Sequence, residues 1–285
     1  MNAQVKLIEC PRDAMQGIKP FIPTDLKIRY LNELLQVGFD TLDFGSYVSG
    51  GAIPQMRDTA AVLRELETEG SSTRLLAIVA NERGAQEAVS QEKITFLGFP
   101  LSVSETFQQR NTNSNIVTSM DRVRRIHELC RQTGKELVIY LSMGFGNPYG
   151  DAWSPELVCK QAEEVVSLGI GVISVADTVG VATPEGIRAV FSQLIPRYPG
   201  IEWGVHLHSR PENWKEKIGA AWESGCRRFD GTVKGYGGCP MAADTLIGNM
   251  ATENLLLFAR EKKVSTGIDK KALDKAAHIA LEIFS

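Results

Sequence analysis

The sequence lacks the features of a membrane protein and of a nucleic-acid-binding protein. No apolar run approaches the ~20 residues that a membrane-spanning helix needs. The N-terminus carries no charged leader with an apolar segment behind it, and the C-terminus carries no targeting signal that we recognise. No run of Lys and Arg is present, and 31 basic residues against 34 acidic ones give a net charge of −3. We therefore expect neither a membrane nor a nucleic acid as a partner.

Cysteine is scarce and shows no paired spacing. The five cysteines form an odd set, which is typical of a reducing compartment and not of a disulfide framework. With 43% hydrophobic and 23% charged residues, the composition is that of an ordinary globular protein. We expect a cytoplasmic location. The 285 residues allow two small domains or one large α/β domain.

What the sequence does contain is a recurring order of strand-like apolar run, turn and amphipathic helix. Eight short runs separated mostly by such helices indicate parallel βαβ units. The predicted strands are residues 5–9, 40–44, 74–79, 93–98, 136–141, 171–175, 201–205 and 227–230.

Several helices have clear start signals. Thr183-Pro184 and Ser154-Pro155 each place an N-cap residue before a proline at the first helical position. Thr118-Ser119 is predicted to open a third helix, and residues 269–283 form a last one. Apolar residues then recur at helical spacing behind each start.

Eight βα units are compatible with two folds, a (β/α)8 barrel and a doubly wound open sheet. The glycine fingerprint of a dinucleotide-binding sheet is missing after the first strand, where Cys10-Pro11-Arg12-Asp13 stands instead. Polar residues gather just past the ends of many strands, which is where a barrel keeps its active site. We therefore predict one α/β domain over residues 1–285, a (β/α)8 TIM barrel with additional C-terminal helices from about residue 252 onward.

The pair His206 and His208 is the sharpest chemical feature. Two of the four histidines stand two residues apart at the end of a predicted strand, so both imidazoles face the same side. Paired imidazoles at a barrel mouth suit a divalent metal when carboxylate or amide oxygens join them. Two histidines that meet backbone carbonyls at the rim are the alternative.

Arg12 and Asp13 follow the first strand. A barrel brings this loop beside the loop after strand seven, so Asp13 is a candidate third ligand. Arg12 is a candidate fixed cation for an oxygen that develops negative charge. A salt bridge within the loop is the alternative for this pair.

Cys239 lies between Gly238 and Pro240, directly after the last predicted strand. Flanking glycine suits a mobile loop that brings a side chain over a site. An inert loop thiol is the alternative.

Other polar residues share the position at strand ends. Asn249 follows Cys239 by ten residues, Asp177-Thr178 follows strand six, and Asp43 and Ser46 lie at the end of strand two. Each alone is an ordinary cap or turn residue, and their common position in a barrel makes them candidates for the site.

At these residues the sequence resembles the 3-hydroxy-3-methylglutaryl-CoA lyase family, within a larger group of metal-dependent barrel lyases and Claisen-condensing enzymes. The matches run in the family's order from about Val5 to Phe258. The condensing enzymes resemble this lyase in the Arg-Asp and His-x-His motifs but not in the cysteine loop. The shared motifs are Pro11-Arg12-Asp13, Ser46-Tyr47-Val48-Ser49, Ile53-Pro54-Gln55-Met56, Ser104-Glu105-Thr106-Phe107, Asn111, Asp177-Thr178-Val179-Gly180-Val181, His206-Leu207-His208, Gly237-Gly238-Cys239-Pro240 and Gly248-Asn249-Met250-Ala251-Thr252-Glu253.

The resemblance implies a set of site residues. A divalent cation, Mg²⁺ or Mn²⁺, would be held by Asp13, His206, His208 and Asn249. The implied catalytic residues are Arg12, Cys239, His206 and Asp13, and the implied substrate-binding residues are Arg12, Asp43, Ser46, Asp177 and Thr178. The chain departs from the family pattern at Cys10 and Ala14, where glycine is usual, at Asp43, where glutamate is usual, and at Ser209, where aspartate is usual.

The implied reaction is the retro-Claisen cleavage of 3-hydroxy-3-methylglutaryl-CoA, or of a close 3-hydroxyacyl-CoA, to acetoacetate and acetyl-CoA. Arg12 would face the forming enolate oxygen, Asp13 or His206 would accept the hydroxyl proton, and Cys239 would protonate the enolate carbon. We expect a homodimer with an acyl-CoA substrate.

Two other functions compete with this one. The first is an acetyl-CoA-dependent Claisen-condensing acyltransferase, which the cysteine loop argues against. The second is a non-catalytic binding barrel, which the retention of four candidate ligands together with Arg12 and Cys239 argues against.

Overall fold

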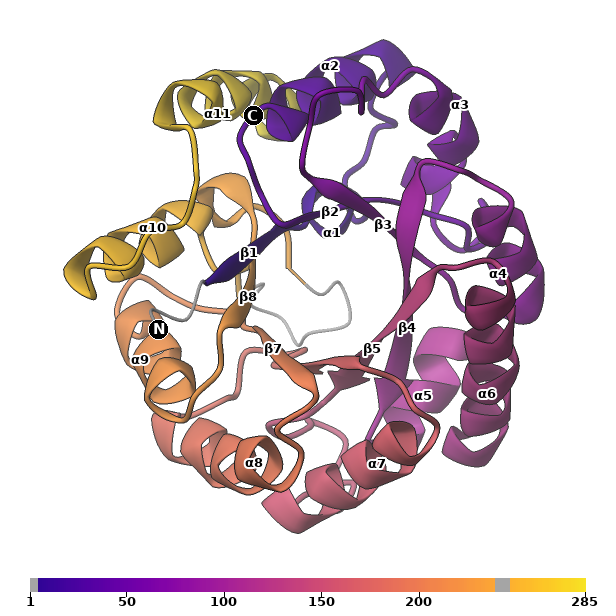
Figure 1. Ribbon diagram of the computed structural model, residues 1–285, viewed down its shortest axis with the longest axis vertical. Helices are drawn as coiled ribbons and strands as arrows, with labels where there is room; N and C mark the ends of the chain where they lie inside the picture. The colour runs from indigo at the N-terminus through magenta and orange to yellow at the C-terminus, as the bar shows by residue number, and fades with distance from the viewer. Residues whose placement is uncertain (1–4, 239–246) are drawn as a thin grey trace.

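The protein is a closed barrel of parallel strands surrounded by helices (Figure 1). The computed structural model describes residues 5–238 and 247–285. The strands follow one another around the ring in sequence order, and β1 closes it by pairing with β8. The described strands are β1 (Lys6–Glu9), β2 (Thr41–Ser46), β3 (Arg74–Ile78), β4 (Ile94–Ser102), β5 (Glu136–Ser142), β6 (Val172–Ala176), β7 (Glu202–His206) and β8 (Arg228–Gly231). The predicted (β/α)8 barrel is confirmed, and each strand overlaps its predicted range.

Helices cover the outer face of the barrel and pack their apolar sides against the strands. The last of them, α11, lies beside α2, where Phe284 meets the Tyr30 ring edge-on. The described helices are α1 (Pro11–Met15), α2 (Thr24–Leu35), η1 (Pro54–Met56), α3 (Thr59–Arg64), α4 (Glu82–Val89), α5 (Glu105–Thr112), α6 (Ile116–Gln132), α7 (Pro155–Ser167), α8 (Pro184–Arg197), α9 (Trp214–Glu223), η2 (Val233–Gly235), α10 (Thr252–Glu261) and α11 (Lys270–Phe284), where η marks a 3₁₀ helix. The expected C-terminal helices are therefore present.

Three of the four predicted helix starts, at Ser154, Thr183 and Asp269, are confirmed and one is wrong. The side chains of Ser154 and Thr183 cap α7 and α8 by accepting backbone hydrogen bonds. The start predicted at Thr118 lies inside the first turn of α6, because Asn115 is the N-cap. Asn115 has an extended backbone, and its Oδ1 accepts from the Thr118 amide at 2.7 Å. The helix therefore begins at Ile116, before the predicted start.

The inside of the barrel is layered by polarity. Near the amino ends of the strands, Arg228 donates to Glu202 at 3.0 Å and Lys6 pairs with the same carboxylate. An apolar layer lies farther along the strands and consists of Leu76, Ile78, Phe96, Val138 and Val172. The polar residues described below occupy the carboxyl ends, in keeping with the usual position of a barrel active site.

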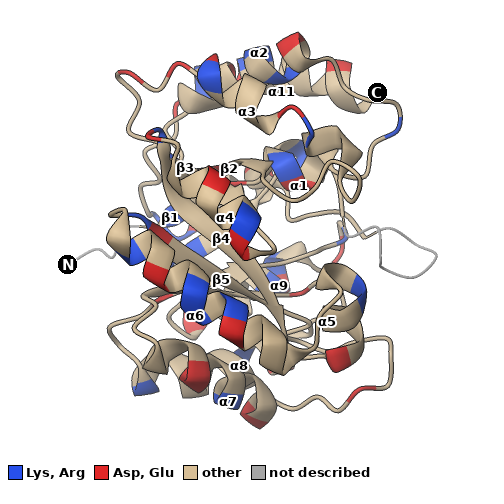
Figure 2. Cartoon of the chain, turned by 90° about the vertical axis from the view of Figure 1, so that its right-hand side faces the viewer, with Lys and Arg blue, Asp and Glu red and all other residues tan. Residues whose placement is uncertain are grey.

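The outer surface carries mixed charge. On the side shown in Figure 2, Lys and Arg alternate with Asp and Glu along α4 and α6. Several of these charges pair, such as Arg124 with Asp121 and Arg125 with Glu82. Among the described residues, no helix is long and apolar enough to cross a membrane.

Candidate active site

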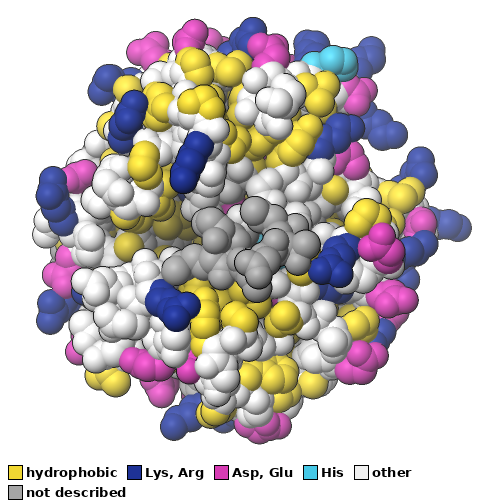
Figure 3. Space-filling view, turned by 180° about the vertical axis from the view of Figure 1, so that it is seen from behind, with side chains coloured by type: hydrophobic (Ala, Val, Ile, Leu, Met, Phe, Trp, Pro, Cys, Tyr) yellow, Lys and Arg dark blue, Asp and Glu magenta, His cyan; other side chains and the backbone are white. Residues whose placement is uncertain are grey.

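A cavity of about 430 Å³ opens at the carboxyl ends of the strands. It is lined by residues from β2, β3, β4, β5, β6 and β7 and from α1 and α5, including Arg12, Asp13, Asp43, His206 and His208. In the face shown in Figure 3, hydrophobic side chains gather above and below the centre, and several Lys and Arg side chains stand among them. The structure therefore brings the two motifs from opposite ends of the sequence into one cavity.

Arg12 and Asp13 lie on the short helix α1, not in the loop that the sequence suggests. The Arg12 guanidinium holds the Asp43 carboxylate, with Nε at 3.1 Å and Nη2 at 2.5 Å from Oδ2. Its remaining nitrogen donates to Gln16 at 2.9 Å and to Asp13 at 3.3 Å. Burial raises the pKa of Asp43 to about 6, even with the guanidinium beside it. Arg12 is thus fixed on two sides at the cavity wall.

His206 ends β7 and His208 follows two residues later, with ring centroids 5.4 Å apart. His206 Nδ1 lies 3.2 Å from Asp230 Oδ2, and His208 Nδ1 lies 2.6 Å from the Asp177 carbonyl oxygen. A proton on each Nδ1 satisfies both contacts and leaves each Nε2 with its lone pair. His208 Nε2 is buried without a hydrogen-bond partner among the described residues.

Asn249 reaches the site through an antiparallel bridge to His208. Its Nδ2 donates to Asp13 Oδ2 at 2.8 Å and to the Tyr236 carbonyl at 3.0 Å. Its Oδ1 is buried and has no partner among the described residues. The Tyr236 ring stacks on Phe284 of α11 with centroids 4.3 Å apart, so the last helix supports the backbone that holds Asn249.

These residues fit a divalent cation. The ligand atoms of Asp13, His206 and His208 lie within 4.8 Å of one another. A carboxylate, two imidazoles and an amide oxygen form a mixed N/O donor set that suits such an ion. Buried polar atoms are normally hydrogen-bonded. His208 Nε2 and Asn249 Oδ1 have no partner in the described part of the chain, which indicates a ligand that completes the site.

The electrostatics favour the metal-binding forms of Asp13 and His208, whereas the protonated form of His206 is favoured until a cation displaces its proton. Burial disfavours the charged Asp13 carboxylate, but Arg12 and the two imidazoles outweigh it and lower the pKa of Asp13. Burial also opposes the charged form of His206, yet the hydrogen bond that its Nδ1 donates to Asp230 and the charge of Asp13 raise its pKa. Burial and the adjacent imidazole lower the pKa of His208, which keeps this ring neutral.

Of the remaining predicted substrate-binding residues, only some line the cavity. Thr178 lines the cavity and its Oγ1 accepts from the Met143 amide at 2.8 Å. Asp177 and Ser46 are not among the described lining residues. The Asp177 carboxylate turns to Lys217, and Ser46 Oγ donates to the Ile78 carbonyl. Cys239 lies outside the described residues.

Sequence reasoning missed several residues of the cavity wall. Gln16 stands one helical turn after Arg12 and Asp13, a spacing that could have pointed to it. Tyr140 points inward from β5, which strand alternation could have predicted. Arg110 stacks on the Tyr149 ring, with its guanidinium carbon 4.7 Å from the centroid, and nothing in the sequence marks it.

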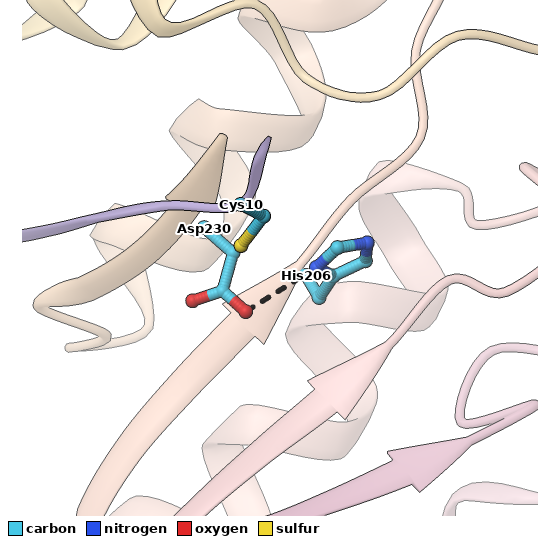
Figure 4. A group of neighbouring side chains, drawn as sticks. All are labelled: Cys10, His206 and Asp230. Carbon is cyan, nitrogen blue, oxygen red and sulfur yellow. Dashed lines mark hydrogen bonds and ion pairs between the residues drawn. The ribbon is translucent and has the colours of Figure 1, made fainter. Parts of the chain in front are cut away.

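A second group of side chains lies against His206. Cys10 and Asp230 are both buried and stand beside its Nδ1 edge (Figure 4). Burial and the nearby carboxylates raise the pKa of the Cys10 thiol well above its usual value. Asp230 Oδ1 has no hydrogen-bond partner among the described residues, although Oδ2 is bonded to His206.

Comparison with known proteins supports the sequence resemblance. The chain is 32% identical over 266 residues to the cytoplasmic 3-hydroxy-3-methylglutaryl-CoA lyase of Rattus norvegicus, covering 93% of this chain and 77% of that protein. It is 29% identical to (R)-citramalyl-CoA lyase of Chloroflexus aurantiacus, covering 97% and 90%. A solved HMG-CoA lyase from Acinetobacter baumannii, in complex with coenzyme A and 3-methylmalate, superposes with a TM-score of 0.90 at 29% identity, covering 99% and 91%. The HMGL-like family model matches residues 4–279, and the chain belongs to the HMGL-like family.

Proposed function

We propose that this protein is a divalent-cation-dependent carbon–carbon lyase that cleaves 3-hydroxy-3-methylglutaryl-CoA to acetoacetate and acetyl-CoA. This proposal rests on the convergence of Asp13, His206, His208 and Asn249 beside Arg12. Two of their ligand atoms have no hydrogen-bond partner among the described residues. Family membership supports the same chemistry, because relatives across the whole chain are named as lyases of hydroxyacyl-CoA thioesters.

The proposed cation, Mg²⁺ or Mn²⁺, would be held by Asp13, His206, His208 and Asn249. When bound, it supplies Lewis acidity that lowers the pKa of the substrate hydroxyl and orients it. The identity of the ion belongs to the proposal, since a mixed N/O donor set accepts several divalent metals.

Proton abstraction and enolate stabilisation are assigned to side chains of the protein itself. Asp13 or His206 accepts the proton of the tertiary hydroxyl, whose oxygen then becomes the ketone of acetoacetate as the adjacent carbon–carbon bond breaks. The bonding electrons pass into the thioester, and the Arg12 guanidinium faces the oxygen of this enolate. Because Asp43 and Gln16 hold the guanidinium in place, it is already oriented before charge develops.

Cys239 is proposed to protonate the enolate carbon and so complete acetyl-CoA. Support for this role comes from the family's cysteine loop. Replacement of Cys239 by Ala should lower kcat by about 10²- to 10⁴-fold, the usual contribution of a positioned general acid. Cys159→Ala, on α7 and buried, is the matched control and should keep wild-type turnover. Near-normal turnover in Cys239→Ala would favour the condensing acyltransferase or the binding barrel.

The deciding assay follows acetyl-CoA and acetoacetate after the purified protein and Mg²⁺ are mixed with 3-hydroxy-3-methylglutaryl-CoA. A parallel reaction with citramalyl-CoA tests the closest alternative substrate that the relatives suggest. Release of acetyl-CoA from the first substrate at the higher kcat/KM is the expected result. No acetyl-CoA from either thioester would reject the lyase proposal.

The proposal places the protein in the cytoplasm. All four described cysteines are free thiols, which suits a reducing compartment, and the rat relative is named as cytoplasmic. A homodimer remains a prediction.

A further inference from the structure

Beside the proposed cation site lies a second set of metal-ligating side chains. Cys10, His206 and Asp230 each offer one ligand atom, and these atoms lie within 4.8 Å of one another (Figure 4). They come from the N-cap of α1, the end of β7 and β8. We propose that this set binds a thiophilic divalent cation such as Zn²⁺ or Cd²⁺ through thiolate, imidazole and carboxylate.

The spacing of the donors matches a tetrahedral ion. Zinc with its usual bond lengths separates a nitrogen and an oxygen ligand by about 3.4 Å. His206 Nδ1 and Asp230 Oδ2 are 3.2 Å apart, close to that edge. Zinc separates sulfur and nitrogen ligands by about 3.6 Å, so from a separation of at most 4.8 Å the Cys10 Sγ needs to move by no more than about 1.2 Å.

Two further observations indicate that the set can take a ligand. Asp230 is 2% exposed, and its Oδ1 has no hydrogen-bond partner among the described residues, which is unusual for a buried carboxylate. Cys10 and His206 both line the cavity at the barrel mouth, so an ion has a path to them. On binding, the Cys10 thiol releases its proton to solvent.

The two sites share one imidazole and therefore exclude each other. A neutral imidazole has one lone pair, and a proton on Nδ1 leaves it at Nε2. Ligation of a thiophilic ion by His206 Nδ1 shifts the remaining ring proton to Nε2 and removes that nitrogen from the set with Asp13 and His208. The ion would then inhibit the enzyme. This inhibition rests on the proposed function, whereas binding of the ion does not.

Cadmium absorbance tests the binding directly, because a cadmium–thiolate bond gives an ultraviolet charge-transfer band. The full-length protein is stripped with chelator and titrated with Cd²⁺, alongside Cys10→Ala and Cys130→Ala. Cys130 is the matched control, since it is also a thiol with 1% exposure but lies on α6 away from the site. We expect a saturable band with one equivalent of Cd²⁺ in the wild type and in Cys130→Ala, and its loss in Cys10→Ala.

Cys10→Ser is the second variant, since it keeps the side-chain size and gives no sulfur band. Circular dichroism establishes that both Cys10 variants are folded. An unchanged band in the two variants, or no band in the wild type, overturns the site. Excess Mn²⁺ should move the midpoint of the wild-type titration to a higher Cd²⁺ concentration. A titration that Mn²⁺ does not change overturns the inference that the two sites share His206. Both readouts are independent of lyase activity, so they separate this inference from the proposed function.

Discussion

The substitution Lys217→Met tests whether the buried ion pair between Lys217 and Asp177 positions the His208 imidazole. Lys217 Nζ is almost fully buried and donates to Asp177 Oδ2 at 2.8 Å, to the His208 carbonyl at 2.8 Å and to the Gly180 carbonyl at 3.2 Å. The Asp177 carbonyl in turn accepts from His208 Nδ1. The ion pair therefore fixes the two backbone segments that orient one imidazole.

The expected cost follows from the burial of this pair. The substitution leaves Asp177 as a buried carboxylate whose remaining donor among the described residues is the Ala182 amide, 2.9 Å away. Breaking a buried pair by removing one partner costs about 3–5 kcal/mol. Lys215→Met is the matched control on the same helix, because its pairing with Glu261 is solvent-exposed and should cost about 0–1 kcal/mol.

Urea unfolding followed by circular dichroism measures the two costs. The double variant Lys217→Met/Asp177→Asn should recover part of the loss, because the asparagine keeps an acceptor for Ala182 without a buried charge. Mn²⁺ affinity gives a second readout, and loss of a group that orients a metal ligand typically costs 10- to 100-fold. A cost for Lys217→Met below about 1 kcal/mol, equal to that of Lys215→Met, would refute the supporting role.

Three further predictions concern the site and the fold. Chelator treatment should abolish lyase activity and added Mg²⁺ or Mn²⁺ should restore it, so full activity in metal-stripped protein would end the metal hypothesis. Arg12→Lys should lower kcat by about 10²- to 10³-fold, because one ammonium cannot replace the fork that holds Asp43, and a loss under about tenfold would show that Arg12 mainly positions α1. Burial raises the pKa of Glu9 from 4.5 to about 8, so its folded-state protonation stabilises the protein at low pH and this contribution declines as pH rises from 4.5 to 8. Urea titrations at several pH values should therefore show that the unfolding free energy of Glu9→Gln rises relative to that of the wild type, by up to about 1.4 kcal/mol per pH unit across this window. A difference in unfolding free energy that does not change with pH would contradict the raised pKa of Glu9.

The sequence by itself determined the barrel and indicated that Arg12, Asp13, His206 and His208 lie at one end of it. Short apolar runs alternating with capped helices are local signals, and the parallel sheet follows from them. The two-residue period of a strand placed His206 and His208 on one side before any tertiary contact was known. The position of Arg12 and Asp13 just after the first strand was enough to bring them near those histidines once the ring closed.

The tertiary structure alone decided what the polar side chains contact. Asp177 stands at a strand end as predicted, yet its carboxylate turns to Lys217 from α9, a partner 40 residues away that no local pattern indicates. Asp230 ends a predicted strand and Cys10 follows the first one, and neither position predicts a contact with His206. They meet this histidine because β8 pairs with both β1 and β7. Periodicity fixes the face on which a side chain lies, but its partner depends on which distant segments the closed ring brings together, and that is a property of the packed fold.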